Sequence, residues 1–269
     1  MIAAAVRHMR AASLDEALEA LAGPDAMALA GGQSLLPVLK LRVIRPDVLV
    51  DIGRLDLGGV RLDGNELRIG ALTTWDELAR TTELHQPPLA AIAECAADIG
   101  DLQVRNRGTL GGSLAHADPA SDLPAVALAL GAQLVVRSAS GERTIEASHF
   151  FLGPFTTALD QGELITEVVL PVAAGAGSAY VKVEHPASGF ALAGAAALVR
   201  REGEESVAVT GIGAHAFLLS AEDDPLDVLA SAEIYGDRFA PADYRRHLAG
   251  VVVARALERA RRRREGEDG

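Results

Sequence analysis

Cysteine is nearly absent from this sequence, because its 269 residues include only Cys95. A single cysteine excludes a disulfide framework, a cysteine-rich zinc site and any iron–sulfur cluster with cysteine ligands built within the chain. A chain without disulfides is typical of a reducing compartment, so we expect a cytoplasmic protein.

Positive charge is in deficit as well: 25 Lys and Arg stand against 37 Asp and Glu, which gives a formal net charge of −12. This balance argues against binding to a nucleic acid backbone.

Long apolar runs are also missing, since Phe190 to Val199 is well short of the roughly 20 residues that a membrane span needs. The run Ile2 to Val6 is too short for a signal peptide, so we expect neither a membrane span nor a targeting segment.

The residues that are present suit a folded protein of one large domain or two smaller ones, with 49% apolar and 23% charged residues. Ser13 to Leu21 predicts a capped amphipathic helix, because Glu16 follows the Ser13 cap and the apolar positions share one face. Ala26 to Ala30 predicts a buried strand. Similar patterns predict strands at Val48 to Ile52, Leu67 to Ala71, Gln133 to Arg137 and Glu163 to Leu170, and helices at Thr74 to Arg80, Pro87 to Gly100 and Asp122 to Ala129.

The most linker-like stretch is Ala173 to Ser178, which places a domain boundary near residue 175. Beyond it, the pattern predicts a small antiparallel sheet of three strands followed by helices. The three strands are expected at Ala179 to Glu184, Phe190 to Arg200 and Val207 to Ile212, and the helices at Pro225 to Ser231 and Ala242 to Arg263.

Two glycine pairs, Gly31-Gly32 and Gly111-Gly112, are the main feature of the first half of the chain. Glycine reaches positive φ freely and lets a phosphate oxygen approach the backbone N–H groups, so two such loops can hold the two phosphates of one dinucleotide. The alternative is that each pair only makes a tight turn, because single glycine pairs usually do. Neither pair fits the Rossmann or Walker pattern.

With their surroundings, the glycine pairs resemble the medium, FAD-binding subunit of the molybdenum hydroxylases, as in aerobic carbon monoxide dehydrogenase and the flavin region of xanthine dehydrogenase. The similarity covers nearly the whole chain in the same order. It is carried by ALAGGQSLLPVLKLRVIRPDVLVDI (Ala28 to Ile52), IGALTTWDELA (Ile69 to Ala79), QVRNRGTLGGSLAHADPASDLPAVALALGA (Gln103 to Ala132), FFLGPFTTAL (Phe150 to Leu159), GELITEVVLP (Gly162 to Pro171) and YRRHLAGVVVARAL (Tyr244 to Leu257).

The resemblance implies an α+β fold with a two-lobed FAD-binding domain of the vanillyl-alcohol-oxidase (PCMH) type over residues 1–175, its lobes being about 1–54 and 55–175. A small C-terminal α+β domain, like that of the carbon monoxide dehydrogenase flavoprotein, would cover residues 176–269, with a three-stranded antiparallel sheet and helices.

The resemblance also implies a set of residues that bind non-covalent FAD. Ile99 and Ile165 would contact the flavin or the adenine, Asp122 would accept hydrogen bonds from a cofactor hydroxyl, and Lys182 would lie near the flavin. The pyrophosphate would be held by Ala28, Leu29, Ala30, Gly31, Gly32, Gln33, Ser34 and Leu35, and by Thr109, Leu110, Gly111, Gly112 and Ser113.

Two of these residues have simpler interpretations. Asp122 can be only the N-cap of the helix that Pro124 begins, and a lysine in a strand such as Lys182 is more often a solvated edge residue. The chain also departs from the family pattern, which usually has an acidic residue where Gly189 stands and often a basic residue at His185-Pro186. These departures concern the contacts on the C-terminal side of the flavin.

The function implied is electron transfer from [2Fe–2S] clusters, through FAD, to an external acceptor, with no substrate chemistry in this chain. Molybdopterin and the clusters are expected only in partners, a large molybdenum subunit and a small iron–sulfur subunit, forming a heterotrimer that is commonly doubled. Two alternatives stay open at this point. One is a stand-alone FAD-dependent oxidoreductase of the same fold, and the other is a nucleotide-binding module without redox activity.

Overall fold

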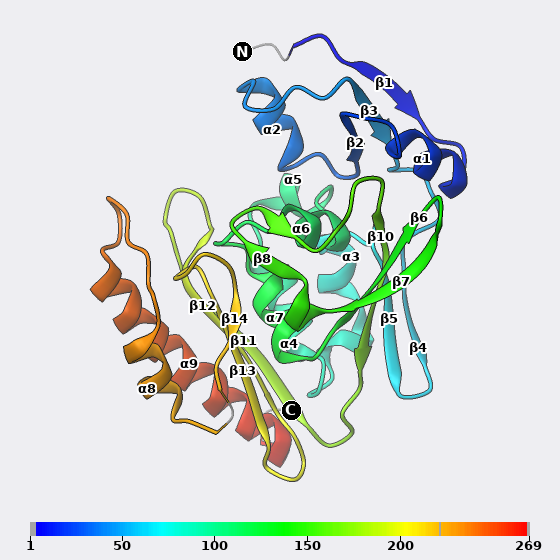
Figure 1. Cartoon of the computed structure of the whole chain (residues 1–269). Coiled ribbons are helices and arrows are strands. Elements are labelled where there is room, and N and C mark those ends of the chain that lie inside the picture. Colours follow the sequence, from blue (N-terminus) through cyan, green and yellow to red (C-terminus); the bar gives the residue numbers. More distant parts are fainter. Residues whose placement is uncertain (1–3, 221, 268–269) are drawn as a thin grey trace.

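The computed structural model describes residues 4–220 and 222–267, so residues 2 and 3 of the N-terminal apolar run lie outside it. Its first lobe is a small parallel sheet of order β1-β3-β2, with two helices (Figure 1). Ser13 caps the first helix as predicted: its hydroxyl accepts a hydrogen bond from the Glu16 N–H, while the Glu16 carboxylate accepts one from Ala12. The elements are β1 (Arg7–Arg10), α1 (Leu14–Leu21), β2 (Ala26–Leu29), α2 (Leu35–Lys40) and β3 (Val48–Asp51).

The second lobe is built on an antiparallel sheet of order β4-β5-β10-β6-β7. Its strands are β4 (Val60–Asp63), β5 (Glu66–Gly70), β6 (Gln133–Ser138), β7 (Gly141–Glu146) and β10 (Leu164–Pro171). Between β5 and β6 the chain forms five helices, which are α3 (Trp75–Arg80), α4 (Ala90–Asp98), α5 (Leu102–Arg105), α6 (Leu110–His116) and α7 (Leu123–Ala129). Between β7 and β10 it forms the hairpin of β8 (Phe151–Gly153) and β9 (Thr156–Thr157). The helix predicted at Pro87 to Gly100 is shorter in the structure, where α4 spans Ala90–Asp98. Helix α3 begins with a capping box formed by Thr74 and Glu77.

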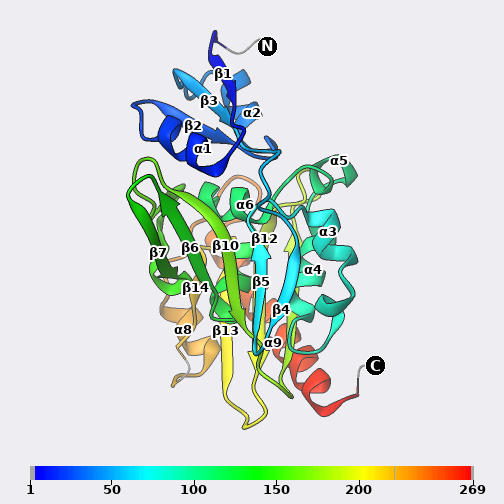
Figure 2. The ribbon, with the colours of Figure 1, turned by 90° about the vertical axis from the view of Figure 1, so that its right-hand side faces the viewer.

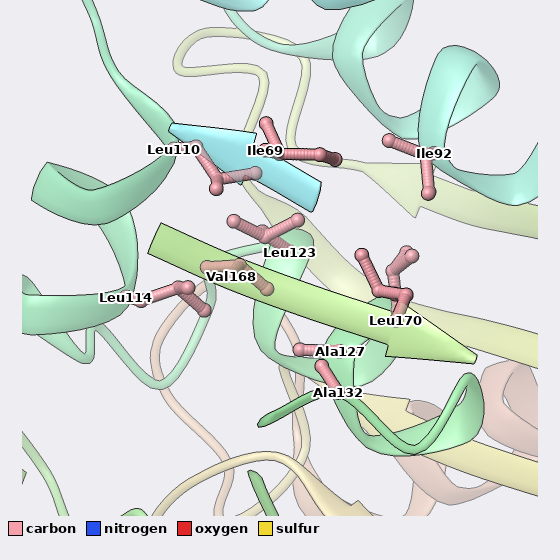
Figure 3. A pocket seen from close by; sticks show the side chains of 10 residues that line it. Ile69, Ile92, Leu110, Leu114, Leu123, Ala127, Ala132, Val168 and Leu170 are labelled. Atoms are coloured by element: carbon pink, nitrogen blue, oxygen red, sulfur yellow. The ribbon is translucent and has the colours of Figure 1, made fainter. Parts of the chain in front are cut away.

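Apolar side chains fill the space between this sheet and the helices beside it. Ile69 on β5 and Val168 on β10 face Leu110 and Leu114 of α6 and Leu123 of α7 (Figure 3). The cavity left between them measures about 10 Å³, which is about the space of a single water molecule. The interior is therefore close-packed, and this region offers no room for a ligand.

The C-terminal part adds a second antiparallel sheet of order β11-β12-β13-β14. We predicted three strands, and the structure corrects this by adding the short strand β14, which pairs with β13. Helix α9 packs on one face of the sheet and helices α4 and α7 on the other, so the second lobe and the C-terminal part stack as alternating layers (Figures 1 and 2). The elements are β11 (Gly177–Glu184), β12 (Ala191–Val199), β13 (Glu205–Thr210), β14 (Phe217–Leu218), α8 (Pro225–Ser231) and α9 (Ala242–Glu265).

Strand β12 is made mostly of small residues because helices cover both of its faces. Its residues from Ala193 to Val199 are all buried. A side chain at Gly194 would begin 2.6 Å from the Tyr180 hydroxyl of β11, so only glycine fits there. In the part of the chain that the structure describes, no helix is long and apolar enough to cross a membrane.

The stretch from Ala173 to Ser178 forms a tight turn between β10 and β11 instead of an extended linker. The Ala176 N–H donates to the Ala173 carbonyl at 3.0 Å, and Gly175 takes a positive φ of 75°. Residues on both sides of the turn belong to one apolar cluster, since Leu170 and Tyr180 are both members. The domain boundary at residue 175 therefore stays a prediction, and it falls within a continuous core.

A buried ion pair joins the two sides of this core. Lys182 on β11 has a side chain that is 3% exposed, and its Nζ lies 2.9 Å from Oδ2 of Asp122, which is 6% exposed. Lys182 also donates to the carbonyls of Asp98 and Gly189, at 2.9 and 2.8 Å, and the Tyr180 hydroxyl donates to Asp122 Oδ1 at 2.5 Å. Burial raises the pKa of Asp122, although the Lys182 charge and these hydrogen bonds oppose the rise.

Removal of one member of this pair should cost more stability than removal of both charges. Lys182→Met leaves a buried carboxylate without a counterion, so we expect it to lower the free energy of unfolding by about 3–5 kcal/mol near neutral pH. The double variant Lys182→Met/Asp122→Asn should lose clearly less, because no unpaired charge remains. Urea unfolding of both variants and of wild type measures these differences.

The pH dependence provides a second check on the ion pair. Because Asp122 has a raised pKa in the folded state, protonation favours folding, and its contribution falls as the pH rises from the unfolded value near 3.8 through the folded one. Without Lys182 the carboxyl pKa rises further, so the deficit of Lys182→Met should shrink as the pH is lowered. A deficit that is independent of pH, or a double variant as unstable as the single one, would contradict the interpretation.

Candidate functional site

The first glycine pair lies at the carboxyl end of the parallel strand β2, between that strand and α2. Within residues 4–220 and 222–267, the backbone N–H groups of Gly31, Gly32, Gln33 and Ser34 donate to no protein atom. Gln33 and Ser34 are exposed, and Gly31 and Gly32 are half-buried. Successive free N–H groups around a residue in the left-handed region form a concavity that binds anions, and the carboxyl ends of parallel strands are a common place for ligands.

The two glycines of this loop have different roles. Gly32 has a φ of +75°, the left-handed conformation that glycine adopts without strain, and this reverses the chain before α2. Gly31 permits close packing instead, because a Cβ built there would lie 1.8 Å from the Arg107 carbonyl oxygen. The first lobe therefore touches the second lobe through bare backbone at this point.

The second glycine pair is part of helix α6, so the prediction of a loop there is wrong. Thr109 caps the helix, and its Oγ1 accepts a hydrogen bond from the Gly112 N–H at 3.2 Å. The N–H groups of Leu110 and Gly111 donate to the carbonyls of Thr73 and Ala71, at 2.9 and 2.8 Å. The N–H groups from Leu110 to Ser113 are thus used within the fold, unlike those of the first loop.

The structure brings the two glycine segments together. A Cβ on Gly112 would lie 4.0 Å from the Cβ of Ala30, so this glycine faces the end of β2 with a bare Cα. Gly112 is exposed, whereas Gly111 is buried against Ala71. The site therefore combines a loop with free N–H donors and a helix turn whose surface lacks side chains. A phosphate group could bind to the N–H groups of the loop and lie close to the backbone of the helix turn.

A chain of polar contacts connects α6 to the buried ion pair. Ser113 Oγ lies 3.0 Å from Ser121 Oγ, and Ser121 precedes Asp122. The Asp122 carboxylate makes no capping bond to α7, so the simple N-cap interpretation is wrong for its side chain. The interpretation of Lys182 as a solvated residue is also wrong, because its ammonium group is buried and its three acceptors are protein oxygens.

The other predicted residues lie at distinct places around the helices. Ile165 is 6% exposed on β10, and half-buried Ile99 follows the last residue of α4 and packs on the same apolar cluster. The remaining members of the first segment, Ala28, Leu29 and Leu35, are half-buried at the ends of β2 and α2. The roles of all these residues toward a cofactor stay predictions.

Two further residues shape the surroundings of the site through long-range contacts. The structure places Tyr180 in the core, where its hydroxyl donates a hydrogen bond to Asp122. Gly108 allows the tight packing beside the first loop, because a Cβ there would lie 2.7 Å from the Trp75 indole nitrogen. No local pattern marks Gly108, since its importance arises from the distant Trp75.

The turn that departs from the family pattern has a local structural reason. Gly189 has a φ of +72°, which an acidic residue would adopt only with strain, and its carbonyl accepts a hydrogen bond from Lys182. His185 packs edge-on against Phe239, with ring centroids 4.6 Å apart. The turn is therefore held by contacts with its own chain, and Phe190 beside it is 47% exposed.

Comparison with known proteins identifies relatives of the whole chain. Residues 4–173 match the family described as FAD binding domain in molybdopterin dehydrogenase. The carbon monoxide dehydrogenase medium chain of Hydrogenophaga pseudoflava is 38% identical, over 88% of this chain and 90% of the relative. The glyceraldehyde dehydrogenase medium chain of Sulfolobus acidocaldarius is 44% identical, over 74% of this chain and 71% of the relative.

Solved structures agree with this assignment. A chain of the Hydrogenophaga pseudoflava carbon monoxide dehydrogenase that lacks the Mo-pyranopterin moiety superimposes with a TM-score of 0.91 at 36% identity, covering 98% of this chain and 99% of that one. A chain of reconstituted carbon monoxide dehydrogenase from Oligotropha carboxidovorans gives 0.92 at 33% identity. The relatives are named as medium chains, which are subunits of multi-subunit enzymes. This chain therefore belongs to the family of the FAD binding domain in molybdopterin dehydrogenase, and it is an FAD-binding oxidoreductase subunit of the molybdenum hydroxylases.

Proposed function

We propose that this chain holds FAD with the pyrophosphate on the loop from Gly31 to Ser34, facing Gly112, and passes electrons from a partner's iron–sulfur clusters to an external acceptor. The observation that carries the proposal is the apposition of the free N–H groups of this loop with the bare surface of Gly112. Two acidic phosphates suit such donors, because N–H groups directed at an anion need no rearrangement when it binds.

The division of work between subunits follows from the chain's own composition. With Cys95 as its single cysteine, which is moreover buried in the core, the chain cannot ligate an iron–sulfur cluster with cysteines. FAD, when bound, supplies the exchange of electrons, and the residues of this chain bind it, orient it and shield it. We propose a heterotrimer with a small iron–sulfur subunit and a large molybdenum subunit, commonly doubled, located in the cytoplasm.

A flavin titration tests the cofactor site directly. Excess FAD is added to the purified chain, unbound ligand is removed, and the absorbance spectrum gives the ratio of flavin to protein. We expect a ratio near one. If the chain alone retains no flavin, the titration is repeated with the co-expressed complex, and a flavin-free complex would overturn the proposal.

The matched variants Gly112→Val and Gly58→Val test the position of the pyrophosphate. The valine at Gly112 fills the space beside Ala30 and displaces the Thr109 hydroxyl, which lies 2.7 Å from a Cβ at that position, so we expect loss of FAD binding by a folded chain. Gly58 is exposed with open space around it, so Gly58→Val should retain FAD. Circular dichroism and thermal unfolding report folding, and full flavin occupancy in Gly112→Val would contradict the assignment.

Turnover assays distinguish an electron-transfer subunit from a stand-alone enzyme. An electron-transfer subunit should reduce no acceptor from an organic substrate by itself, but it should accept electrons once the partner subunits are present. Steady oxidation of a small aldehyde, purine or N-heterocycle by the isolated flavin-loaded chain would favour the stand-alone oxidoreductase instead.

A further inference from the structure

The segment from α2 to Pro46 carries large apolar side chains that are exposed to solvent. Its sequence, LLPVLKLRVIRP from Leu35 to Pro46, is almost entirely apolar apart from three basic residues. Yet α2 buries only Leu39, while Leu41 is 61% exposed and Val43 is 72% exposed. Figure 1 shows α2 on the side of the first lobe opposite α1. A six-residue helix with one buried side chain gains little from packing, so these exposed side chains need another explanation.

The charge of this segment differs from that of the whole chain. Between Gly31 and Pro46 there is no acidic residue, whereas Lys40, Arg42 and Arg45 are all basic and exposed. The whole chain has a net charge of −12. We define the α2 patch as Lys40, Leu41, Val43 and Arg45. A cationic patch with an apolar centre on an acidic protein is complementary to an acidic surface with an apolar centre.

The backbone supplies a second, independent observation. Arg42 has a φ of +60°, so it occupies the left-handed position that follows a helix and that usually belongs to glycine or asparagine. Long side chains in this region are strained, and such strain is retained mainly at functional positions. The turn presents Leu41 and Val43 to solvent on either side of this arginine.

We propose that the α2 patch is a docking surface for an acidic face of a partner subunit of the molybdenum hydroxylase complex. The inference rests on the proposed function, since it assumes that the chain assembles with other subunits. It places the partner next to the Gly31 to Ser34 loop, because α2 begins where that loop ends. The partner then covers Leu41 and Val43, and its carboxylates meet the basic side chains around them.

Association of the flavin-loaded chain with its co-purified partner subunits tests the patch. Val43→Asp places a carboxylate in the apolar centre, so we expect at least tenfold weaker assembly by gel filtration or a fluorescence titration. Leu62→Asp is the matched control, because Leu62 is 60% exposed on β4, in another part of the molecule, and should assemble like wild type. Both variants should keep FAD and melt near the wild-type temperature, since neither side chain is buried.

Charge reversal measures how much the basic side chains contribute to association, apart from the apolar contact. The double variant Lys40→Glu/Arg45→Glu should slow association and reduce its dependence on salt concentration, whereas Arg255→Glu, at an exposed position of α9, should not. Unchanged assembly of Val43→Asp and of the double variant would overturn the inference. So would self-association of wild type through this patch, or binding of wild type to phosphatidylglycerol vesicles that Val43→Asp abolishes.

The outcomes distinguish this inference from the proposed function. If neither the chain nor the complex binds FAD, the proposed function fails whatever the assembly results are. If FAD binds and the Val43→Asp chain still assembles with normal affinity, the proposed function stands and only the docking surface is wrong. The variants lie outside the FAD loop, and Leu36 is left unchanged because its side chain packs against Gly32.

Discussion

The arrangement of the site depends on one close backbone contact, between Gly31 of the first lobe and Arg107 of the second. A Cβ on Gly31 would overlap the Arg107 carbonyl oxygen at 1.8 Å, so the distance between the lobes is set by the absence of a side chain. Because Gly32 follows in the left-handed conformation, the loop turns away with its N–H groups free. The same contact brings Ala30 opposite Gly112, and thereby creates the site.

Each pair consequently contains one glycine needed for packing and one that borders the ligand site, and the sequence pattern does not distinguish these two roles. Gly31 and Gly111 are packing residues, since each lies against backbone or side-chain atoms of a neighbouring segment. Gly32 and Gly112 border the space that an anion would enter, one through its conformation and the other through its bare surface. Substitution at the packing positions should therefore disturb the relation of the lobes, whereas substitution at Gly112 acts mainly on the ligand.

Local sequence patterns predicted most elements but not the long-range pairings. The Ser13 cap and the Thr74 capping box act within one turn, so helices α1 and α3 were correctly predicted. Strand β1, with the sequence RHMR, has no strand pattern of its own and forms because it pairs with buried β3. Likewise, Gly111 and Gly112 are helical because contacts with Ala71 and Thr73, distant in the sequence, fix the first turn of α6.

The environment of Lys182 limits what its charge can do for a cofactor. An ammonium group has three N–H donors, and all three are directed at protein oxygens, of Asp98, Asp122 and Gly189. Its charge is also offset by the Asp122 carboxylate 2.9 Å away, so the pair exerts a weaker field on its surroundings than a lone cation would. The family resemblance implies that Lys182 lies near the flavin, and a direct bond between them would require one of the three protein acceptors to be released. If the three bonds persist when FAD binds, Lys182 influences the flavin only indirectly, through the position of the Gly189 turn.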